Sequence, residues 1–184
     1  MMTVDAERGR GEFCGMLAGM GAKRGAEIGV WAGEFSEMLC RMVPGLHLTC
    51  VDPWMAYDDY REKKNDQPRL EAAYQATRAR LKRMPHEILR MTSFQAAALV
   101  PDGSLDFVYI DGNHAEQFVR ADLERWSPKV RQGGIVAGHD YELKPTHAHV
   151  EVKAAVDAFM RDHRIENGYV LTKDKAPSFY WVKP

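Results

Sequence analysis

Residues 27–36 read Glu27-Ile28-Gly29-Val30-Trp31-Ala32-Gly33-Glu34-Phe35-Ser36, and they pass from an apolar strand through two glycines into a helix. A glycine at such a turn lets the backbone approach a ligand closely, because it carries no Cβ. In an open parallel sheet, ligands bind just beyond the carboxyl ends of the strands, where the strand order reverses. The stretch therefore predicts a ligand-binding turn. The competing interpretation is a tight structural turn flanked by solvated acids.

The spacing of the glycines argues against a dinucleotide. The dinucleotide fingerprint is G-x-G-x-x-G, and starting at Gly29 it would need glycine where the chain has Trp31 and Glu34. A pyrophosphate would lose its close approach to the backbone and would face a carboxylate. Glu27 suits the cationic amino-acid end of S-adenosylmethionine better. Asp52, at the end of the next predicted strand, can accept hydrogen bonds from ribose hydroxyls.

Apolar runs alternate with amphipathic segments along the chain. Strands are predicted at residues 25–30, 47–52, 87–91, 105–111, 134–139, 169–173 and 179–183, and helices at residues 7–20, 35–43, 68–84, 94–100, 115–130 and 150–163. This alternation implies right-handed βαβ crossovers and an α/β fold, with a seven-stranded, mostly parallel sheet and helices on both faces. The short connection before the last strand predicts a hairpin, so that strand should be antiparallel. Phe118, Leu123 and Trp126 are predicted core residues.

Length and composition predict a single domain over residues 1–184, with a helical extension at 1–24 and a candidate lid loop at 53–67. The formal net charge of −1 and the scattered basic residues give no support for a nucleic-acid partner. No apolar stretch approaches the roughly 20 residues that span a bilayer, so no membrane partner is expected. Three cysteines without paired spacing, and the lack of an apolar leader, predict a cytoplasmic protein.

Three further motifs accompany the glycine turn. They are Val51-Asp52-Pro53-Trp54, Tyr109-Ile110-Asp111-Gly112-Asn113-His114 and Gly133-Gly134-Ile135-Val136-Ala137-Gly138-His139-Asp140-Tyr141. With these motifs the chain resembles the class I S-adenosylmethionine-dependent methyltransferases over residues 26–141. The last two motifs resemble the branch that contains the macrolide-sugar and cephalosporin-pathway O-methyltransferases. The resemblance implies a Rossmann-like fold, S-adenosylmethionine as the cofactor and transfer of a methyl group to a hydroxyl.

The resemblance also implies which residues bind the cofactor. They are Glu27, Gly29, Trp31, Gly33, Asp52, Ser93, Phe94 and Asp111, with Ser93 and Phe94 near the adenine. The commoner glycine pattern in these enzymes is E-x-G-x-G-x-G, and this chain departs from it because Trp31 stands at the middle glycine.

Four titratable residues, Asp111, His114, His139 and Asp140, follow two strands that should be neighbours in this fold. Asp111 and Asp140 offer hard oxygen ligands for Mg²⁺, and His139 could complete the shell. Catechol-type and sugar O-methyltransferases hold a divalent metal here, so the resemblance implies a metal that lowers the pKa of an acceptor hydroxyl. His114 is the candidate general base. Asp111, the second candidate catalytic residue, is expected to orient the acceptor together with Asp140. The alternative for His114 is a structural histidine bonded to backbone.

Three other functions compete with methyl transfer to oxygen. The first is a metal-dependent hydrolase, because two segments resemble metallophosphoesterase motifs: Gly112-Asn113-His114 and Gly138-His139-Asp140. That hydrolase family also needs D-x-H and G-D-x-x-D motifs, which the chain lacks. Methylation of nucleic-acid bases is disfavoured because no Pro-Pro occurs. A non-catalytic protein that binds S-adenosylmethionine or S-adenosylhomocysteine remains open.

The acceptor is also open, and sugars, catechol-like aromatics and polyketides all qualify as small-molecule acceptors. The loops at 57–65 and 144–149 are expected to wall the acceptor pocket. The N-terminal helix and the C-terminal hairpin are candidate contacts in a homo-oligomer.

Overall fold

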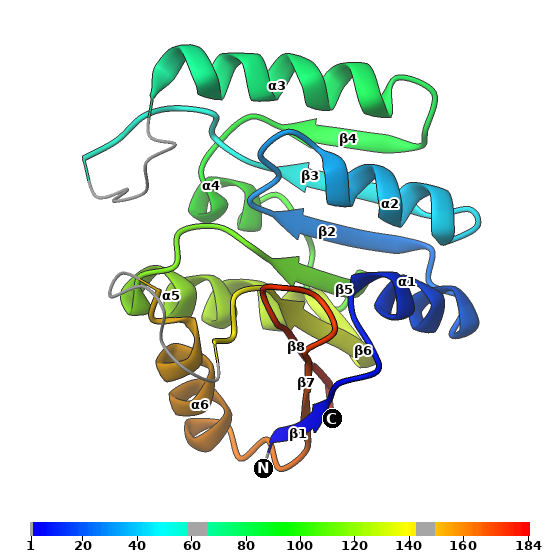
Figure 1. Ribbon diagram of the computed structural model, residues 1–184, viewed down its shortest axis with the longest axis vertical. Coiled ribbons are helices and arrows are strands. Elements are labelled where there is room, and N and C mark those ends of the chain that lie inside the picture. The colour runs from blue at the N-terminus through cyan, green and yellow to red at the C-terminus, as the bar shows by residue number, and fades with distance from the viewer. Residues whose placement is uncertain (1, 59–65, 143–149) are drawn as a thin grey trace.

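One eight-stranded sheet, ordered β1-β7-β8-β6-β5-β2-β3-β4, forms the centre of the computed structural model, which describes residues 2–58, 66–142 and 150–184 (Figure 1). The strands are β1 Met2–Asp5, β2 Arg24–Ile28, β3 His47–Val51, β4 His86–Leu89, β5 Leu105–Ile110, β6 Val130–Gly138, β7 Gly168–Leu171 and β8 Ser178–Val182. The helices are α1 Arg10–Gly19, α2 Glu34–Met42, α3 Gln67–Leu81, α4 Ser93–Ala97, α5 Glu116–Trp126 and α6 Val152–Asp162, with a 3₁₀ turn, η1, at Ser127–Lys129.

The order of the strands reverses between β2 and β5. From β2 the chain proceeds outward through β3 and β4, and it then crosses back to β5 and β6 on the other side. All of these strands pair in parallel, while β8 lies antiparallel between β6 and β7. The reversal places the carboxyl ends of β2 and β5 side by side, which is where open α/β sheets bind their ligands.

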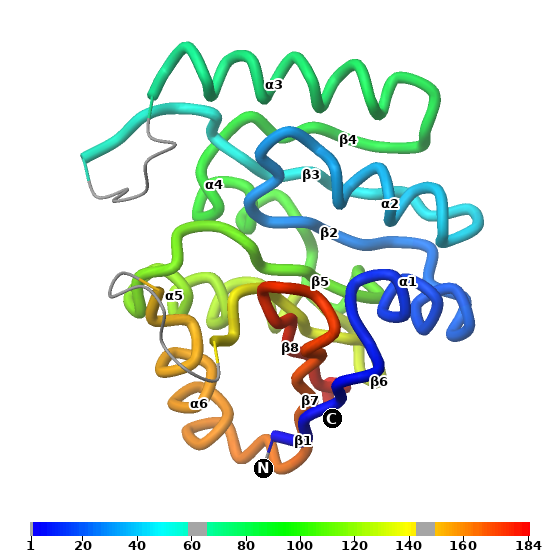
Figure 2. The backbone as a smooth tube through the Cα atoms, viewed as in Figure 1, coloured from blue at the N-terminus to red at the C-terminus, as the bar shows by residue number. Residues whose placement is uncertain are grey.

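Two apolar cores cover the two faces of the sheet. One contains buried residues of α1, α2 and α3, such as Phe13 and Leu39. The other contains buried residues of α4, α5 and α6, such as Leu123 and Trp126. Figure 2 traces the same path of the backbone. The predicted class of fold, including the antiparallel last strand and the helices on both faces, is confirmed.

The prediction of seven strands was wrong by one. Residues 2–5 lie inside the predicted helical extension, but they form β1, which pairs in parallel with β7 at the edge of the sheet. Four residues are too short for a periodic pattern to reveal a strand.

The predicted helix at 115–130 was also too long, because α5 ends at Trp126, next to Pro128 in η1, and β6 already begins at Val130. Among the described residues, no helix combines the length and apolar character needed to cross a bilayer.

Candidate active site

The turn after β2 is held against the ends of both neighbouring strands. The amide of Gly29 donates to the carbonyl of Val51 (2.8 Å), and the amide of Asp111 donates to the carbonyl of Ile28 (2.7 Å). Gly29 has φ +87°, and a Cβ added there would lie 2.1 Å from the carbonyl oxygen of Asp111. Only glycine therefore allows the two chain segments to approach so closely.

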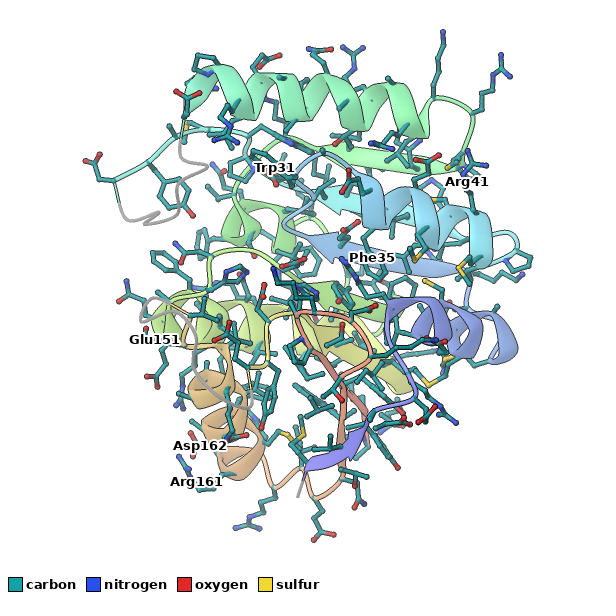
Figure 3. The ribbon with its side chains drawn as sticks, viewed as in Figure 1. Trp31, Phe35, Arg41, Glu151, Arg161 and Asp162 are labelled. Atoms are coloured by element: carbon teal, nitrogen blue, oxygen red, sulfur yellow. The ribbon has the colours of Figure 1, made fainter. Side chains whose placement is uncertain are left out.

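Trp31 occupies the middle-glycine position and keeps a glycine-like backbone, with φ +52°. Figure 3 places it on the turn between β2 and α2. Its carbonyl accepts hydrogen bonds from Trp54 Nε1 (2.7 Å) and Thr77 Oγ1 (3.0 Å). These contacts hold in place a conformation that L-residues rarely adopt. The tryptophan therefore adopts the left-handed backbone that a glycine would adopt at this position.

Asp52 supports the same turn from the end of β3. Its Oδ2 accepts from the amides of Val30 and Trp31 (both 3.0 Å), and its Oδ1 accepts from the amide of Trp54 (2.7 Å). Burial raises the pKa of Asp52, although the three amide bonds oppose that shift. A carboxylate oxygen has two lone pairs, so Oδ1 can still accept from a ribose hydroxyl. Asp52 thus holds the turn and also lines the cavity described below.

Glu27 lies beneath the turn and is only 2% exposed. Its carboxyl accepts a hydrogen bond from the hydroxyl of Ser36 on α2. Burial raises its pKa to about 8, the Ser36 bond opposes this, and the nearby carboxylates of Asp111 and Asp52 add to it. Glu27 does not line the cavity that contains Asp52. Because its raised pKa keeps the carboxyl largely protonated at neutral pH, contact with a cationic ligand requires this buried side chain both to lose its proton and to shift.

The buried Glu27 carboxyl makes the free energy of unfolding depend on pH. Its pKa is about 8 in the folded protein and about 4.5 in an exposed glutamate, so the folded state holds an extra proton between those values. Stability should therefore fall as pH rises from about 4.5 to 8. We expect the wild-type protein to lose on the order of 3 kcal/mol of its free energy of unfolding over this range, and Glu27→Gln to abolish this loss. Urea unfolding at pH 5 and pH 8 measures it, and parallel pH profiles for the two proteins would contradict the assignment.

A cavity of about 590 Å³ opens at the carboxyl ends of β2, β3 and β5. This volume is typical of sites for small molecules and cofactors. Its lining comes from the glycine turn, the segment after β3 and helices α4 and α5: Ile28, Gly29, Trp31, Val51, Asp52, Pro53, Met55, Tyr57, Leu70, Thr92, Ser93, Phe94, Asp111, Gly112, Asn113, Phe118, Ala121, Asp122 and Arg125. Of the predicted cofactor residues, Gly29, Trp31, Asp52, Ser93, Phe94 and Asp111 are in this set, whereas Glu27 and Gly33 are not.

Ser93 and Phe94 form one end of this cavity with residues of α5. The Ser93 hydroxyl donates to Asp122 Oδ1 and accepts from Trp126 Nε1 (2.8 Å). The ring of Phe94 is 66% exposed, and the Arg125 guanidinium lies 4.8 Å from its centre. This end therefore combines a partly buried polar pair with an exposed aromatic ring.

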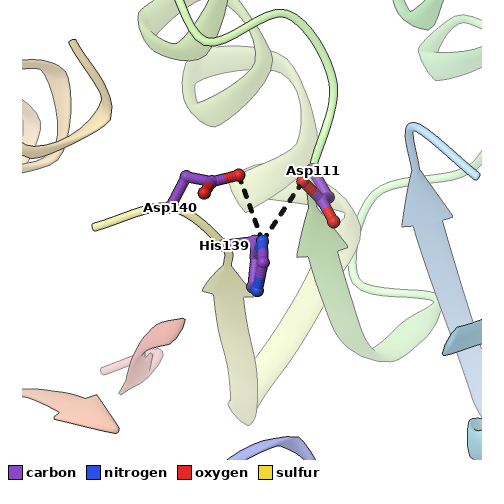
Figure 4. A group of neighbouring side chains, drawn as sticks. All are labelled: Asp111, His139 and Asp140. Atoms are coloured by element: carbon purple, nitrogen blue, oxygen red, sulfur yellow. Dashed lines mark hydrogen bonds and ion pairs between the residues drawn. The ribbon is translucent and has the colours of Figure 1, made fainter. Parts of the chain in front are cut away.

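A cluster of two carboxylates and two histidines lies where β5 and β6 end, and Figure 4 draws three of its members, Asp111, His139 and Asp140. Nδ1 of His139 lies 3.1 Å from Asp140 Oδ2 and 3.6 Å from Asp111 Oδ1. Nε2 of His114 lies 3.2 Å from Asp140 Oδ2 and 3.4 Å from Asp111 Oδ1. Asp140 reaches the cluster from a left-handed backbone, φ +56°, which aspartate tolerates better than most residues. All four predicted residues thus meet, with two imidazoles between two carboxylates.

The carboxylates control the protonation of His139. Burial alone would lower its pKa, but the bonds to Asp111 and Asp140 outweigh burial and raise the pKa to about 9. Burial likewise pushes the pKa of Asp111 upward, and the two histidines overcome it and hold that pKa below its usual range. The cluster therefore holds a proton between His139 and its carboxylate neighbours at neutral pH.

The same atoms fit a divalent cation. One ligand atom each from Asp111, His139 and Asp140 lies within 4.8 Å of the others, and carboxylates with an imidazole are common ligands of divalent metals. A cation bound there would displace the shared proton, as metal binding to protonated ligands generally does. The other ring nitrogen of His139, Nε2, is buried and has no hydrogen-bond partner among the described residues.

The comparison with families of known proteins matches residues 26–141 to a family described as a methyltransferase domain. The chain belongs to this methyltransferase-domain family. The predicted membership is thereby confirmed, while the macrolide-sugar and cephalosporin branch stays a prediction. A curated relative, the uncharacterized protein y4gI of Sinorhizobium fredii (strain NBRC 101917 / NGR234), is 37% identical over 57 residues, which cover 31% of this chain and 6% of that protein. The chain thus spans only a small part of this relative's length.

Solved structures share the fold of this methyltransferase domain at low sequence identity. Cofactor-bound Rv0187 from MTB has a TM-score of 0.70 and 15% identity, covering 95% of this chain and 79% of that one. An O-methyltransferase from Bacillus cereus in complex with SAH has a TM-score of 0.67 and 18% identity, covering 97% and 83%. The O-methyltransferase TomG from Streptomyces achromogenes, in complex with SAM, has a TM-score of 0.63 and 16% identity, covering 98% and 83%.

Several cavity residues of the methyltransferase domain were missed by the sequence analysis. Leu123 and Trp126 are buried as predicted, but Phe118 lines the cavity instead of the core. Asp122 and Arg125 share the cavity-facing side of α5 with Phe118, because residues four and three apart fall on one helix face. Two charged residues, Asp122 and Arg125, on a helix face that was predicted to be core could have indicated that this face lines a cavity. The predicted loops at 57–65 and 144–149 lie almost wholly outside the described residues.

Proposed function

We propose that this protein is an S-adenosylmethionine-dependent O-methyltransferase that acts on a hydroxyl of a small molecule. The observation that carries the proposal is the position of Asp111, which lines the cofactor-sized cavity and also belongs to the cluster with His114 and Asp140. A ligand in the cavity would therefore end beside the groups that can bind and deprotonate an acceptor. The SAH and SAM complexes of the structural neighbours support the choice of cofactor.

In this proposal the cavity orients the cofactor and the cluster orients the acceptor. Asp52 accepts from the ribose, and the turn at Gly29 leaves room for the amino-acid end. When bound, the cofactor would supply a methyl group on a sulfonium. The acceptor oxygen would form the new C–O bond on the side of the methyl opposite the sulfur, while the C–S bond breaks and S-adenosylhomocysteine leaves. Fixing the two in line would contribute much of the rate.

His114 is proposed as the general base of this reaction. Its Nε2 faces Asp111 Oδ1 and Asp140 Oδ2, which only accept hydrogen bonds, so Nε2 carries a proton and donates to them. The other ring nitrogen, Nδ1, would take the proton from the acceptor, and both carboxylates would stabilise the imidazolium that forms. Imidazole is the side chain that most often serves as a general base in enzymes.

A divalent cation is proposed as a further component, held by Asp111, His139 and Asp140. It would lower the pKa of an acceptor hydroxyl. Mg²⁺ is the ion that the resemblance implies, while the imidazole ligand is also suited to Mn²⁺ or Zn²⁺.

The cytoplasmic location, the single-domain organisation and a homo-oligomer likewise remain predictions.

Calorimetry with S-adenosylhomocysteine, with and without Mg²⁺ or Mn²⁺, tests the cofactor and the metal separately. We expect binding without metal, and a metal-dependent change in heat that Asp140→Asn abolishes. Asp157→Asn is a matched control, because Asp157 is an aspartate of α6 that bonds Tyr141 and Lys153 outside the cluster. No heat with S-adenosylhomocysteine under any condition would refute the proposed function. An unchanged metal response in Asp140→Asn would refute only the metal site.

A non-catalytic S-adenosylmethionine-binding protein is the alternative from another class. It would share the cavity, and it would show binding without turnover on any hydroxyl acceptor. The complete Asp111, His114 and Asp140 cluster favours the enzyme, since a binding module has no need for a base beside the ligand.

A further inference from the structure

Arg10 is the first residue of α1, and its guanidinium is held in place without donating a hydrogen bond. Its Cζ lies 5.4 Å from the centre of the Phe35 ring, and its Nε lies 3.9 Å from Asp174 Oδ2, on the loop between β7 and β8. Only 35% of the Arg10 side chain is exposed. Among the described residues, no group accepts a hydrogen bond from the guanidinium. The edge formed by Nη1 and Nη2 can therefore bind an anion.

Asp174 anchors the start of α1 more than it pairs with the Arg10 side chain. Its Oδ2 accepts a hydrogen bond from the backbone amide of Arg10 (2.7 Å), whereas the 3.9 Å to Nε is too long for one. A Cβ added to Gly9 would lie 2.6 Å from the same oxygen, so the glycine allows this close approach. The carboxylate on one side and the Phe35 ring beneath fix the guanidinium, and a fixed group loses less entropy when it binds a ligand.

Arg10 lies on the same side of the sheet as the cluster of carboxylates and histidines. Residues two positions apart on a strand point to the same face, and Tyr109, two positions before Asp111, is buried in the core that α1 and α2 cover. The Tyr109 ring lies 4.4 Å from the Phe35 ring and 6.4 Å from the His139 ring, measured between ring centres. These contacts run from Arg10 across the top of the sheet to the cluster; Phe35 is labelled in Figure 3.

The loop between β7 and β8 connects the same two places. Asp174 holds the start of α1, and the carbonyl of Pro177 accepts from the amide of Tyr141, the residue after Asp140 (3.1 Å). Arg10 and Asp140 both lie outside the set of residues that line the cavity. An acceptor whose hydroxyl meets the cofactor at the cluster can therefore extend out of the cavity toward Arg10.

We propose that Arg10 binds a carboxylate of the acceptor, so that the substrate is a small hydroxy acid whose hydroxyl reaches the cluster. The inference rests on the proposed function, because it requires a methyl acceptor at the cluster. Two parallel N–H groups of a guanidinium match the two oxygens of a carboxylate. A phosphate monoester carries close to two negative charges at neutral pH, which a single guanidinium beside Asp174 does not balance.

The test compares two catechol acids with their neutral amides, in protein saturated with S-adenosylhomocysteine and Mg²⁺. The acids are 3,4-dihydroxybenzoate and 3,4-dihydroxycinnamate, which carry the same two hydroxyls at different distances from the carboxylate. Loss of hydrogen bonds to a charged group weakens binding by about ten- to a hundredfold. By calorimetry we expect the wild-type protein to prefer at least one acid over its amide by that factor. In Arg10→Gln this preference should disappear.

Arg41→Gln is the matched control, because it removes the same charge from the last turn of α2, where Arg41 pairs with Glu37 on the surface (2.7 Å). It should keep the wild-type preference. A preference for the acid that survives in a folded Arg10→Gln protein would overturn the inference and leave the proposed function intact.

The cofactor also carries a carboxylate, and the affinity for S-adenosylhomocysteine distinguishes this second source. Arg10→Gln should bind S-adenosylhomocysteine as tightly as the wild type does. Binding weakened tenfold or more would assign Arg10 to the cofactor and overturn the inference.

The wild-type protein alone also tests the inference, should Arg10→Gln fail to fold. Equal affinity for each acid and its amide, or no binding of either acid, would overturn the role of Arg10 while S-adenosylhomocysteine still binds. Failure of S-adenosylhomocysteine to bind would overturn both this inference and the proposed function.

Discussion

His114→Ala is expected to lower turnover by about 10²- to 10⁴-fold, the range that a general base typically contributes. The imidazole is the group that can take the proton from an acceptor hydroxyl, and Asp111 and Asp140, which face its Nε2, would stabilise the imidazolium that forms. Affinity for S-adenosylhomocysteine should stay near that of the wild type, because His114 does not line the cavity. Turnover with a hydroxyl acceptor and calorimetry with S-adenosylhomocysteine measure the two effects on the same preparation.

His163→Ala is the control for removing an imidazole. His163 ends α6, stacks on Phe159 with 4.1 Å between ring centres and contacts Glu124 on the surface. It should retain full turnover. Wild-type turnover in His114→Ala would reject the base assignment, and loss of ligand binding together with turnover would indicate a structural role for His114.

The fold could be predicted where local patterns and tertiary packing agree. The apolar runs of β2, β3 and β5 are buried strands, as their sequence pattern predicts. The edge strand β1 could not be found, because its four residues acquire a partner only when β7 arrives from the far end of the chain. Such a non-local pairing leaves no periodic signal in the sequence.

The candidate site was predictable where it follows strand ends. Asp111 and Asp140 converge because parallel neighbouring strands end at the same edge of the sheet. The burial of Glu27 could not be foreseen, since which side of β2 faces α2 depends on how Ser36 packs against it. The position of Asp122 in the cavity could not be predicted either, because one helix can line a cavity with some residues and the core with their neighbours.

Gly29→Ala is expected to cause a large loss of stability. The new Cβ would lie 2.1 Å from the carbonyl oxygen of Asp111, and the backbone at φ +87° is unfavourable for alanine. A left-handed residue and a steric overlap with backbone each cost roughly 1–3 kcal/mol, so we expect a loss of about 2–5 kcal/mol in the free energy of unfolding. The clash also separates β2 from β5, and binding of S-adenosylhomocysteine should fall with it. Urea unfolding and calorimetry measure the two losses.

Gly15→Ala provides the matched control, because Gly15 lies inside α1 and no heavy atom lies within 4 Å of the added Cβ. Alanine at a helix interior is more favourable than glycine by roughly 0.5–1 kcal/mol. This variant should therefore be slightly more stable than the wild type and bind the ligand normally. Gly29→Ala could instead be as stable as Gly15→Ala and bind S-adenosylhomocysteine as well. In that case the turn does not depend on the close contact between Gly29 and Asp111, and this contact is not what places the cavity beside the cluster of carboxylates and histidines.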